Sequence, residues 1–474
     1  MTEILKPDLC VIGAGSGGVA LAAAAATMGV SVVLIERGDM GGGCFNHGPV
    51  PSRALIAAAA AAQNIRMAGR FGMKSTEPQV DFLLVRQHIR DVQAKIAANS
   101  SQSRFEAMGV RVIRAAARFT APDCVEAGGL GVKARRFVVA TGSSPAPLLL
   151  EGIDLVRPLT SESILELAEL PPQLVIIGAG PSGLELAQAF RRLGSEVTVL
   201  ETGSALAGQD TEMREPLLRQ LTGEGMVVRE NVHILRVEPR GTGVRLFLAG
   251  QTVEETLDGS HLLIAAGRRP NVDGLGLEAA NVRFDKAGVH VSRSLRTSNR
   301  RVYAIGDAAG LGQHAHLATH HAGLVLRAAF LRQSVRTRPE LVPDMVWCDP
   351  EIASIGLSET AAREKFRDIQ VLRWPFSEND RAQAERASQG LVKVITDRRG
   401  LILGAAICGA GAGDMIAIWS LALGKGMKIA GMADVVHPCP TRGEISRQVA
   451  VSARAGDLRS KWLPGRRALF RWIG

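Results

Sequence analysis

The sequence predicts an α/β fold built around two similar strand–helix–strand units, and two observations lead to this prediction. Residues 9–36 resemble residues 174–201 in the order of their apolar, glycine and acidic positions. The chain has 474 residues, which is enough for about two to four domains with separate cores. Its hydrophobic fraction of 46% and charged fraction of 22% are typical of a globular protein and exclude a mostly disordered chain.

Each repeated segment runs from an apolar strand through G-x-G-x-x-G into a helix and then into a second apolar strand that ends in glutamate. In such a turn the first glycine permits the tight bend, the second lets the backbone approach a pyrophosphate, and the third lets helix and strand pack closely. The helix N-terminus then faces the phosphates, and the glutamate can accept hydrogen bonds from a ribose. The sequence therefore predicts two Rossmann-like dinucleotide-binding domains, with cofactor-binding residues Gly13, Gly15, Gly18 and Glu36 in the first and Gly178, Gly180, Gly183 and Glu201 in the second.

The second glutamate indicates which nicotinamide cofactor binds. A carboxylate at Glu201 would repel a 2′-phosphate, and neither Thr202 nor Gly203 supplies a positive charge to receive one. The sequence therefore favours NADH over NADPH. Two dinucleotides on one chain also suggest that electrons pass between them.

Cysteine usage limits the compartment and the kinds of site. Six cysteines are too few and too scattered for a disulfide-stapled secreted fold, and their spacing provides neither a zinc ribbon nor a C-x-x-C motif. We recognise no signal peptide, and the alanine-rich stretches at 20–26 and 57–62 are too short to span a bilayer. We therefore expect a cytoplasmic protein.

The formal net charge of +10 raises the question of nucleic-acid binding. The basic residues are dispersed along the chain, and no recognisable nucleic-acid motif accompanies them. Arginine also suits phosphate-bearing cofactors. We therefore expect no nucleic-acid partner.

Six further segments carry a resemblance to a known family. They are GGGCFNHGPVPSRAL (41–55), FVVATGSSP (137–145), AAGRRPNVDGLGLE (265–278), VYAIGDAA (302–309), DPEIASIGLSE (349–359) and HPCPTRGE (437–444). In this order and spacing they resemble the flavoprotein disulfide reductases, or class I pyridine nucleotide-disulfide oxidoreductases. That family includes dihydrolipoamide dehydrogenase, mercuric reductase and soluble pyridine nucleotide transhydrogenase. The resemblance covers roughly residues 8–450.

The resemblance implies an FAD-binding domain in two stretches, an NAD(P)-binding domain between them, and a C-terminal α+β dimerisation domain. It also implies a homodimer that uses FAD and NAD(P)H and passes electrons to a small-molecule acceptor. Mapped onto this chain, the FAD domain takes 1–147 and 269–337, the NAD(P) domain 148–268, and the dimerisation domain 338–460, followed by a basic aromatic tail at 461–474.

The resemblance also implies individual cofactor contacts. Asp307 matches the family's aspartate on the flavin ribityl chain, and Thr141 and Gly142 match a turn near the flavin. Glu185 matches a glutamate near the contact between nicotinamide and flavin, and Arg53 stands where the family has lysine. The remaining implied cofactor-binding positions are Gly43, Ala117, Gly267, Arg268 and Ala318.

Two departures from the family pattern bear on the chemistry. The family carries C-x-x-x-x-C with its second sulfur against the flavin, but here Cys44 is followed at that position by Pro49. The family's histidine base, delivered by the partner subunit, is replaced here by Cys439, while His437 and Glu444 remain. Proline has no nucleophile, and a thiol (pKa roughly 8.5) is a poorer base near neutral pH than imidazole (roughly 6.5). Hydride transfer from NADH to flavin needs neither missing part.

We therefore expect an FAD-dependent NAD(P)H oxidoreductase that passes hydride from NADH to flavin and then directly to a quinone, a metal ion, oxygen or a second nicotinamide. One alternative is thiol–disulfide or soft-metal chemistry at an intersubunit pair of Cys44 and Cys439. Another is a degenerate flavoprotein without enzymatic activity. The candidate catalytic residues are Cys44, Cys439, Glu444, His437, Glu185 and Arg53.

Two other features fall outside these assignments. The VYAIGDAA segment is followed by four histidines, which are His314, His316, His320 and His321. Packing or flavin contact is expected for them rather than a metal, because no third type of ligand is indicated.

The C-terminal tail interleaves basic with aromatic residues, which suits peripheral contact with the inner face of a membrane. Docking of the tail on the protein's own dimer is the alternative.

Overall fold

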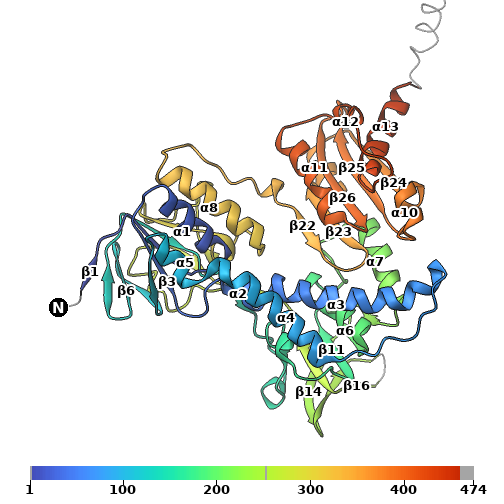
Figure 1. The fold of residues 1–474 in the computed structure, drawn as a ribbon, viewed down its shortest axis with the longest axis horizontal. Helices are drawn as coiled ribbons and strands as arrows, with labels where there is room; N and C mark the ends of the chain where they lie inside the picture. The colour runs from blue at the N-terminus through green and yellow to red at the C-terminus, as the bar shows by residue number, and fades with distance from the viewer. Residues whose placement is uncertain (1–2, 251–252, 459–474) are drawn as a thin grey trace, which may run out of the picture. The chain divides into compact units, whose positions relative to one another are not determined.

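The computed structural model describes residues 3–250 and 253–458, which group into two units (Figure 1). The first unit contains the chain up to Gly203 together with Val228–Thr337. The second contains Ser204–Val227 together with the chain from Arg338 onward. The predicted α/β class with a C-terminal α+β domain is confirmed. The domain limits drawn from the family resemblance stay predictions.

A five-stranded parallel sheet in the order β21-β8-β2-β3-β4 forms the first nucleotide-binding region. Strand β2 (Leu9–Ile12) pairs with β3 (Val32–Glu36), and helix α1 (Ser16–Thr27) connects them, as the first repeated segment predicts. Strand β2 is apolar at every position because both faces of the sheet are covered. The other strands are β4 (Arg111–Arg114), β8 (Arg136–Val139) and β21 (Val302–Ala304).

The second repeated segment forms the same motif in another five-stranded sheet, of order β10-β17-β11-β12-β13. Strand β11 (Gln173–Ile177) pairs in parallel with β12 (Glu196–Leu200), and helix α6 (Pro181–Leu193) connects them. This sheet also contains β10 (Leu159–Thr160), β13 (Val227–Arg229) and β17 (His261–Ile264). A separate antiparallel sheet consists of β14 (Ile234–Arg240), β15 (Gly243–Leu248) and β16 (Glu255–Gly259).

Helices link the two nucleotide-binding regions of the first unit. Helix α3 (Pro49–Met67) packs against both α4 (Phe82–Ala97) and α6, while α1 packs against α8 (Ala315–Ala329). The remaining elements of this unit are α2 (Gly42–Asn46), α5 (Gln102–Ala107), β1 (Ile4–Leu5), β5 (Ala117–Ala121), β6 (Cys124–Ala127), β7 (Leu130–Val132), β9 (Ser143–Pro145), β18 (Arg268–Pro270), β19 (Phe284–Asp285) and β20 (Gly288–Val289).

The second unit is built on an antiparallel sheet of order β22-β23-β26-β25-β24. Helix α11 (Ala412–Gly424) packs on this sheet and buries Trp419 completely in the core. The strands are β22 (Asp344–Val346), β23 (Glu351–Gly356), β24 (Ile369–Pro375), β25 (Leu391–Asp397) and β26 (Ile402–Gly409). The other helices are α7 (Thr211–Gly223), α9 (Glu359–Lys365), α10 (Asp380–Ala384), α12 (Ile429–Ala433) and α13 (Glu444–Leu458).

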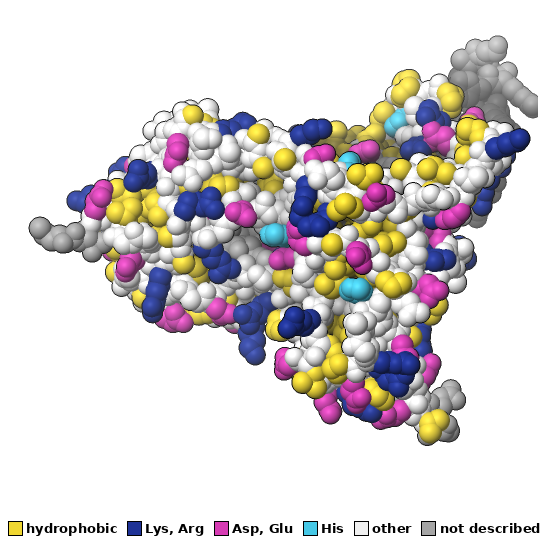
Figure 2. All heavy atoms as spheres, turned by 60° about the horizontal axis from the view of Figure 1, so that its bottom comes forward, with side chains coloured by type: hydrophobic (Ala, Val, Ile, Leu, Met, Phe, Trp, Pro, Cys, Tyr) yellow, Lys and Arg dark blue, Asp and Glu magenta, His cyan; other side chains and the backbone are white. Residues whose placement is uncertain are grey.

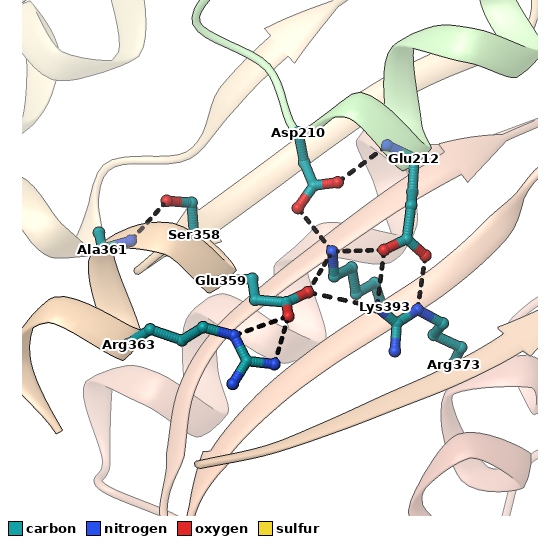
Figure 3. Close-up of polar contacts among 8 residues, drawn as sticks. All are labelled: Asp210, Glu212, Ser358, Glu359, Ala361, Arg363, Arg373 and Lys393. Atoms are coloured by element: carbon teal, nitrogen blue, oxygen red, sulfur yellow. Dashed lines mark hydrogen bonds and ion pairs between the residues drawn. The ribbon is translucent and has the colours of Figure 1, made fainter. Parts of the chain in front are cut away.

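A buried lysine ties α7 to the sheet of the second unit (Figure 3). The Lys393 side chain is 3% exposed, and its Nζ lies 2.8 Å from carboxylate oxygens of Asp210, Glu212 and Glu359. Arg373 on β24 bonds Glu212 at 2.5 Å and Glu359 at 3.2 Å. The hydrogen bond from Arg373, together with the hydrogen bond and charge of Lys393, lowers the pKa of Glu212 to about 2. The buried ammonium is therefore compensated by several carboxylates.

Positive charge is interspersed with negative charge on the face drawn in Figure 2, where Lys and Arg side chains alternate with Asp and Glu. Many arginines pair with neighbouring carboxylates, as Arg229 does with Glu255 at 2.6 Å. Among residues 3–250 and 253–458, no helix has the length and apolar character needed to cross a membrane. The predicted tail at 461–474 lies outside the described residues.

Candidate active site

The first glycine turn has the backbone geometry that its motif predicts. Gly13 has φ +103°, and a Cβ there would collide with the carbonyl of Ala140, which follows the neighbouring strand β8. A Cβ at Gly18 would collide with the carbonyl of Gly13. A Cβ at Gly15 would meet no atom within 4 Å, and no side chain caps the N-terminus of α1. The helix N–H groups therefore face an open space suited to a pyrophosphate.

The second glycine turn repeats this arrangement. Gly178 has φ +110°, and a Cβ there would meet the carbonyl of Ala265 at 2.5 Å. A Cβ at Gly183 would collide with the carbonyl of Gly178. Around Gly180 the space is again open within 4 Å, and α6 has no side-chain cap. Both turns thus fit the phosphates of a dinucleotide.

The two terminal glutamates are held by equivalent backbone groups. Glu36 Oε2 accepts a hydrogen bond of 2.6 Å from the N–H of Ala14, and its Oε1 accepts one of 2.7 Å from Gly38. Glu201 Oε2 accepts 2.8 Å from the N–H of Ala179, within its own glycine turn. Glu201 Oε1 accepts 3.1 Å from the N–H of the residue two positions on. Each carboxylate is thereby fixed beside its glycine turn with lone pairs left for ribose hydroxyls.

Asp307, the predicted ribityl contact, belongs to a network around the paired strands β9 and β18. Its Oδ2 accepts a hydrogen bond of 2.6 Å from Ser143 Oγ. Arg268 donates to Ser143 Oγ at 2.9 Å and to the Ser143 carbonyl at 2.7 Å. Arg268 also pairs with Glu162 at 2.9 Å. The network therefore connects Asp307 to Arg268 through Ser143.

The turn at Thr141–Gly142 is held by Asn271. Thr141 Oγ1 donates to the carbonyl of Asn271 at 2.6 Å, and Asn271 Nδ2 donates back to the carbonyl of Thr141 at 3.0 Å. Gly142 has φ +67°, a conformation that favours glycine. The turn is therefore fixed on the sheet edge that carries the first glycine turn.

The other predicted cofactor contacts fall in four places of the first unit. Gly43 lies on α2, and a Cβ there would approach Arg268 Nη2 at 4.0 Å. Ala117 begins β5 and is buried in the core. Gly267 has φ +113°, and its carbonyl accepts from Ala146. Ala318 on α8 packs close to Gly306. Their roles toward a cofactor stay predictions.

Arg53 and Glu185 are brought together by the packing of α3 on α6. Arg53 Nη2 donates to Glu185 Oε2 at 2.6 Å, and the two side chains are 31% and 9% exposed. Arginine suits such a pair because its planar guanidinium matches the geometry of a carboxylate. The ion pair therefore joins one helix of each nucleotide-binding region.

The segment from Cys44 to Pro49 is split between two helices. Cys44 lies on α2, and Pro49 is the first residue of α3, the helix position that proline favours. Burial raises the pKa of the Cys44 thiol, the Ser16 hydroxyl offsets part of this effect, and the charge of Asp307 raises it again. The environment of Cys44 therefore favours the thiol over the thiolate.

The C-terminal candidates cluster at the start of α13. Cys439 is exposed, and the negative charge of Glu444 raises the pKa of its thiol. Glu444 Oε2 accepts a hydrogen bond of 3.1 Å from the N–H of Thr441. His437 Nε2 is buried without a hydrogen-bond partner in the described part of the chain, and desolvation lowers the pKa of this imidazole. Cys44 belongs to the first unit and Cys439 to the second, so their pairing between subunits stays a prediction.

All six cysteines lie within the described residues and are free thiols. Across residues 3–250 and 253–458, the structure gathers no group of three metal-ligating side chains. In the histidine cluster, the rings of His314 and His316 stack with centroids 5.0 Å apart. His321 is buried and contacts the backbone of Gly306.

Sequence reasoning missed three residues that position the site. Ser143 and Asn271 lie inside segments that carry the family resemblance, so membership of these segments was a usable signal. Glu162 carries no motif, and only the packing of β18 brings it to Arg268.

Comparison with known proteins identifies the class. A family model described as "Pyridine nucleotide-disulphide oxidoreductase" matches residues 7–322, and its dimerisation domain matches residues 342–450. The chain is 35% identical over 457 residues to dihydrolipoyl dehydrogenase 3 of Pseudomonas aeruginosa, covering 94% of this chain and 97% of that protein. It is 34% identical over 451 residues to mercuric reductase of Streptomyces lividans, covering 94% and 95%.

Solved structures agree with this class. The chain superposes on LpdA from Mycobacterium tuberculosis with a TM-score of 0.87 and 25% identity, covering 95% of this chain and 99% of that one. It also superposes on the copper(II) complex of the flavoprotein disulfide reductase RclA from Escherichia coli with a TM-score of 0.84 and 25% identity, covering 94% and 99%.

The chain therefore belongs to the pyridine nucleotide-disulphide oxidoreductase family. It is an FAD-dependent oxidoreductase that uses a pyridine nucleotide, as the two glycine turns and the family motifs predict. The matched dimerisation domain supports a homodimer. The relatives named above are enzymes, so the alternative of a non-enzymatic flavoprotein is not supported.

Proposed function

We propose that this enzyme transfers hydride from NADH to FAD and delivers the electrons directly to a small acceptor, without a C-x-x-x-x-C disulfide. The acceptor is a quinone, a metal ion, dioxygen or a second nicotinamide cofactor. One observation carries the proposal: the segment that begins at Cys44 reaches Pro49, the first residue of α3, where a disulfide relay would need a second thiol.

The hydride transfer from NADH to FAD is supported by residues that match the family pattern. Glu201, held by the N–H groups of Ala179 and Gly203, disfavours a 2′-phosphate and favours NADH. Arg53 and Glu185 supply fixed charges between the two nucleotide-binding regions. When bound, FAD accepts a hydride and passes on two electrons, so the chain itself needs only to bind and orient the two cofactors.

The Cys44 segment lacks the properties that a thiol relay requires. The thiolate is the reactive form of cysteine, and burial raises the pKa of Cys44 rather than lowering it. No second thiol follows it in the α2–α3 segment. Direct transfer to an acceptor therefore fits this segment better than a thiol relay does.

The test is anaerobic titration of the FAD-loaded enzyme with NADH, followed by turnover with a quinone, dioxygen, Hg²⁺, Cu²⁺, thio-NAD⁺ and lipoamide. We expect bleaching of the flavin absorbance by NADH and turnover with at least one non-disulfide acceptor. Turnover with lipoamide alone would contradict the proposal, as would a flavin that NADH does not bleach.

Cysteine variants distinguish the proposal from its alternative. Cys44→Ser and Cys439→Ser should both keep turnover with the best acceptor within about threefold if the cysteines carry no electrons. A loss of more than about tenfold in both variants would instead favour the thiol pair. Cys124→Ser, on β6, is the matched control.

A second candidate function is supported by the residues before α13. Cys439 is exposed, and His437 Nε2 is buried without a hydrogen-bond partner among the described residues, so a sulfur atom and an imidazole nitrogen are available to a soft metal. Because no three ligands gather in the described part of one chain, such a site would need Cys44 of a second subunit. Only monomer on a non-reducing gel, with free thiols at both positions, would contradict a disulfide between subunits.

We also infer a cytoplasmic enzyme whose tail contacts the membrane surface. The support is the alternation of basic and aromatic residues in 461–474, which lie outside the described residues. Flotation with anionic liposomes should recover the full chain and not a chain ending at residue 458. Failure of the full chain to float would contradict the inference.

A further inference from the structure

A buried histidine supports the turn that carries Asp307. His321 on α8 is 1% exposed, and its Nδ1 accepts a hydrogen bond of 3.2 Å from the backbone N–H of Gly306. Gly306 opens the short 3-10 helix η5 (Gly306–Ala309), and Asp307 is its second residue. The first N–H groups of a helix have no carbonyl partner within that helix. The imidazole therefore satisfies a buried donor that would otherwise be unpaired.

The turn formed by Gly306 and Asp307 is also held by its other neighbours. Gly306 has φ +60°, and a Cβ there would lie 2.8 Å from the Cβ of Ala318. On the other side, the Asp307 carboxylate accepts the hydrogen bond from Ser143. Asp307 is thus fixed twice: its backbone through Gly306 by His321, and its carboxylate by Ser143.

The His321 hydrogen bond exists only for one form of the side chain. A neutral imidazole with its proton on Nε2 presents a lone pair at Nδ1, whereas a protonated imidazole presents a second N–H toward the N–H of Gly306. Protonation therefore removes the acceptor and buries a charge. The bond is assigned to the neutral tautomer because a backbone N–H can only donate.

Few ionisable groups face this imidazole. On α8 itself, the ring of His320 lies 6.4 Å from that of His321, centroid to centroid, and Arg327 lies further along the helix. The packed helix α1 brings no ionisable side chain, and η5 brings only Asp307. Burial, with a smaller contribution from His320, lowers the pKa of His321 to about 4.

We propose that His321 is a positioning residue for FAD: its neutral imidazole holds the Gly306–Asp307 turn in the shape that binds the cofactor, and protonation releases the turn and weakens FAD binding. Nothing in this step transfers electrons, because the imidazole only gains a proton from solvent. The inference rests on FAD binding and does not depend on the acceptor.

The sign of the pH dependence follows from the two states of the turn. In the held turn the imidazole stays neutral down to about pH 4, whereas in a released turn it titrates near its ordinary value of 6.5. Between these values only the released turn takes up the proton, so each step down in pH favours release. The FAD affinity of the wild-type enzyme should therefore fall as pH decreases from about 6.5 toward 4.

The test compares the wild-type holoenzyme with His321→Asn and His321→Leu. The asparagine oxygen can accept the Gly306 N–H but does not titrate, and leucine fills similar space without an acceptor. The FAD dissociation constant is measured by flavin fluorescence at pH 7 and in steps down to pH 4.5. His233→Asn, the same change at an exposed histidine, is the matched control.

We expect His321→Leu to bind FAD about tenfold more weakly at pH 7, and His321→Asn to stay within about threefold of wild type. Between pH 6.5 and 4.5, FAD affinity should fall more steeply in wild type and His233→Asn than in His321→Asn. Equal pH dependence of wild type and His321→Asn would overturn the proposal, as would wild-type affinity in a folded His321→Leu. Circular dichroism of the apoproteins reports whether the leucine variant folds, and the asparagine comparison decides the question if it does not.

Discussion

The guanidinium of Arg53 on α3 donates a hydrogen bond of 2.6 Å to the carboxylate of Glu185 on α6. Helix α3 follows the segment that contains Cys44, and α6 follows the second glycine turn. One ion pair thus joins the two halves of the first unit at helices that the sequence assigns to different cofactors. Arginine stands here where the family resemblance implies lysine, and its planar guanidinium matches the geometry of a carboxylate.

Arg53→Met should slow hydride transfer and destabilise the fold. The change leaves Glu185, with a 9% exposed side chain, without its 2.6 Å partner, which should lower the free energy of unfolding by about 1–3 kcal/mol. Urea denaturation measures the stability, and stopped-flow absorbance measures flavin reduction by NADH. Arg53→Lys is the control, because it keeps the charge and should lose less of both. Flavin reduction at the wild-type rate in Arg53→Met would remove Arg53 from the catalytic candidates.

The two fingerprint glutamates should affect different cofactors. Glu36→Ala should weaken FAD binding by about tenfold or more, because it removes the carboxylate held at 2.6 Å by Ala14. Glu201→Ala should instead raise the KM for NADH by about tenfold and reduce discrimination against NADPH. FAD content and steady-state kinetics with both nucleotides measure these effects. The two variants act as controls for each other, and similar effects on both cofactors would contradict the assignment of one site to each.

Glu444→Gln should make Cys439 more reactive. The negative charge of Glu444 is the main cause of the raised thiol pKa, so its removal should lower that pKa and increase the thiolate fraction near pH 8. We expect iodoacetamide to modify Cys439 about two- to tenfold faster in the variant, as followed by peptide mass spectrometry. Glutamine keeps an oxygen for the Thr441 N–H, so the local fold is retained. An unchanged rate would mean that Glu444 does not control this thiol.

Lys393→Met should destabilise the second unit in a pH-dependent way. At pH 7 it removes a 3% exposed ammonium from three carboxylates, which should cost about 3 kcal/mol. Lys393 is the main cause of the lowered pKa of Glu359 and, after Arg373, lowers that of Glu212, whose pKa in the fold is about 2. The stabilisation by the ammonium is therefore lost as pH falls below the free carboxyl value of 4.5 and these carboxylates protonate. The difference between wild type and variant in urea denaturation should therefore shrink below about pH 4.5. Arg363→Met, at a 61% exposed partner of Glu359, is the control and should cost less than about 1 kcal/mol.

The family and both nucleotide-binding motifs were readable in the sequence because they depend on local backbone chemistry. Gly13 and Gly178 are needed for positive φ and for close approach to a neighbouring strand, so their spacing alone predicts the turns. Glu36 ends β3 and Glu201 directly follows β12, which are the positions where the motif expects a carboxylate for a ribose. Pro49 stands where the family resemblance implies a second cysteine, and this too is read directly from the residue types.

Only the tertiary structure decided which distant side chains meet. Arg53 reaches Glu185, and Lys393 reaches Asp210, because helices and strands far apart in the sequence pack together. The bond from Gly306 to His321 depends on how α8 lies against the turn before it, and the presence of four histidines within eight residues of sequence does not reveal it. Local motifs are encoded in a few φ angles and residue types, whereas these contacts and the pKa shifts that they cause depend on burial, and burial is a property of the whole fold.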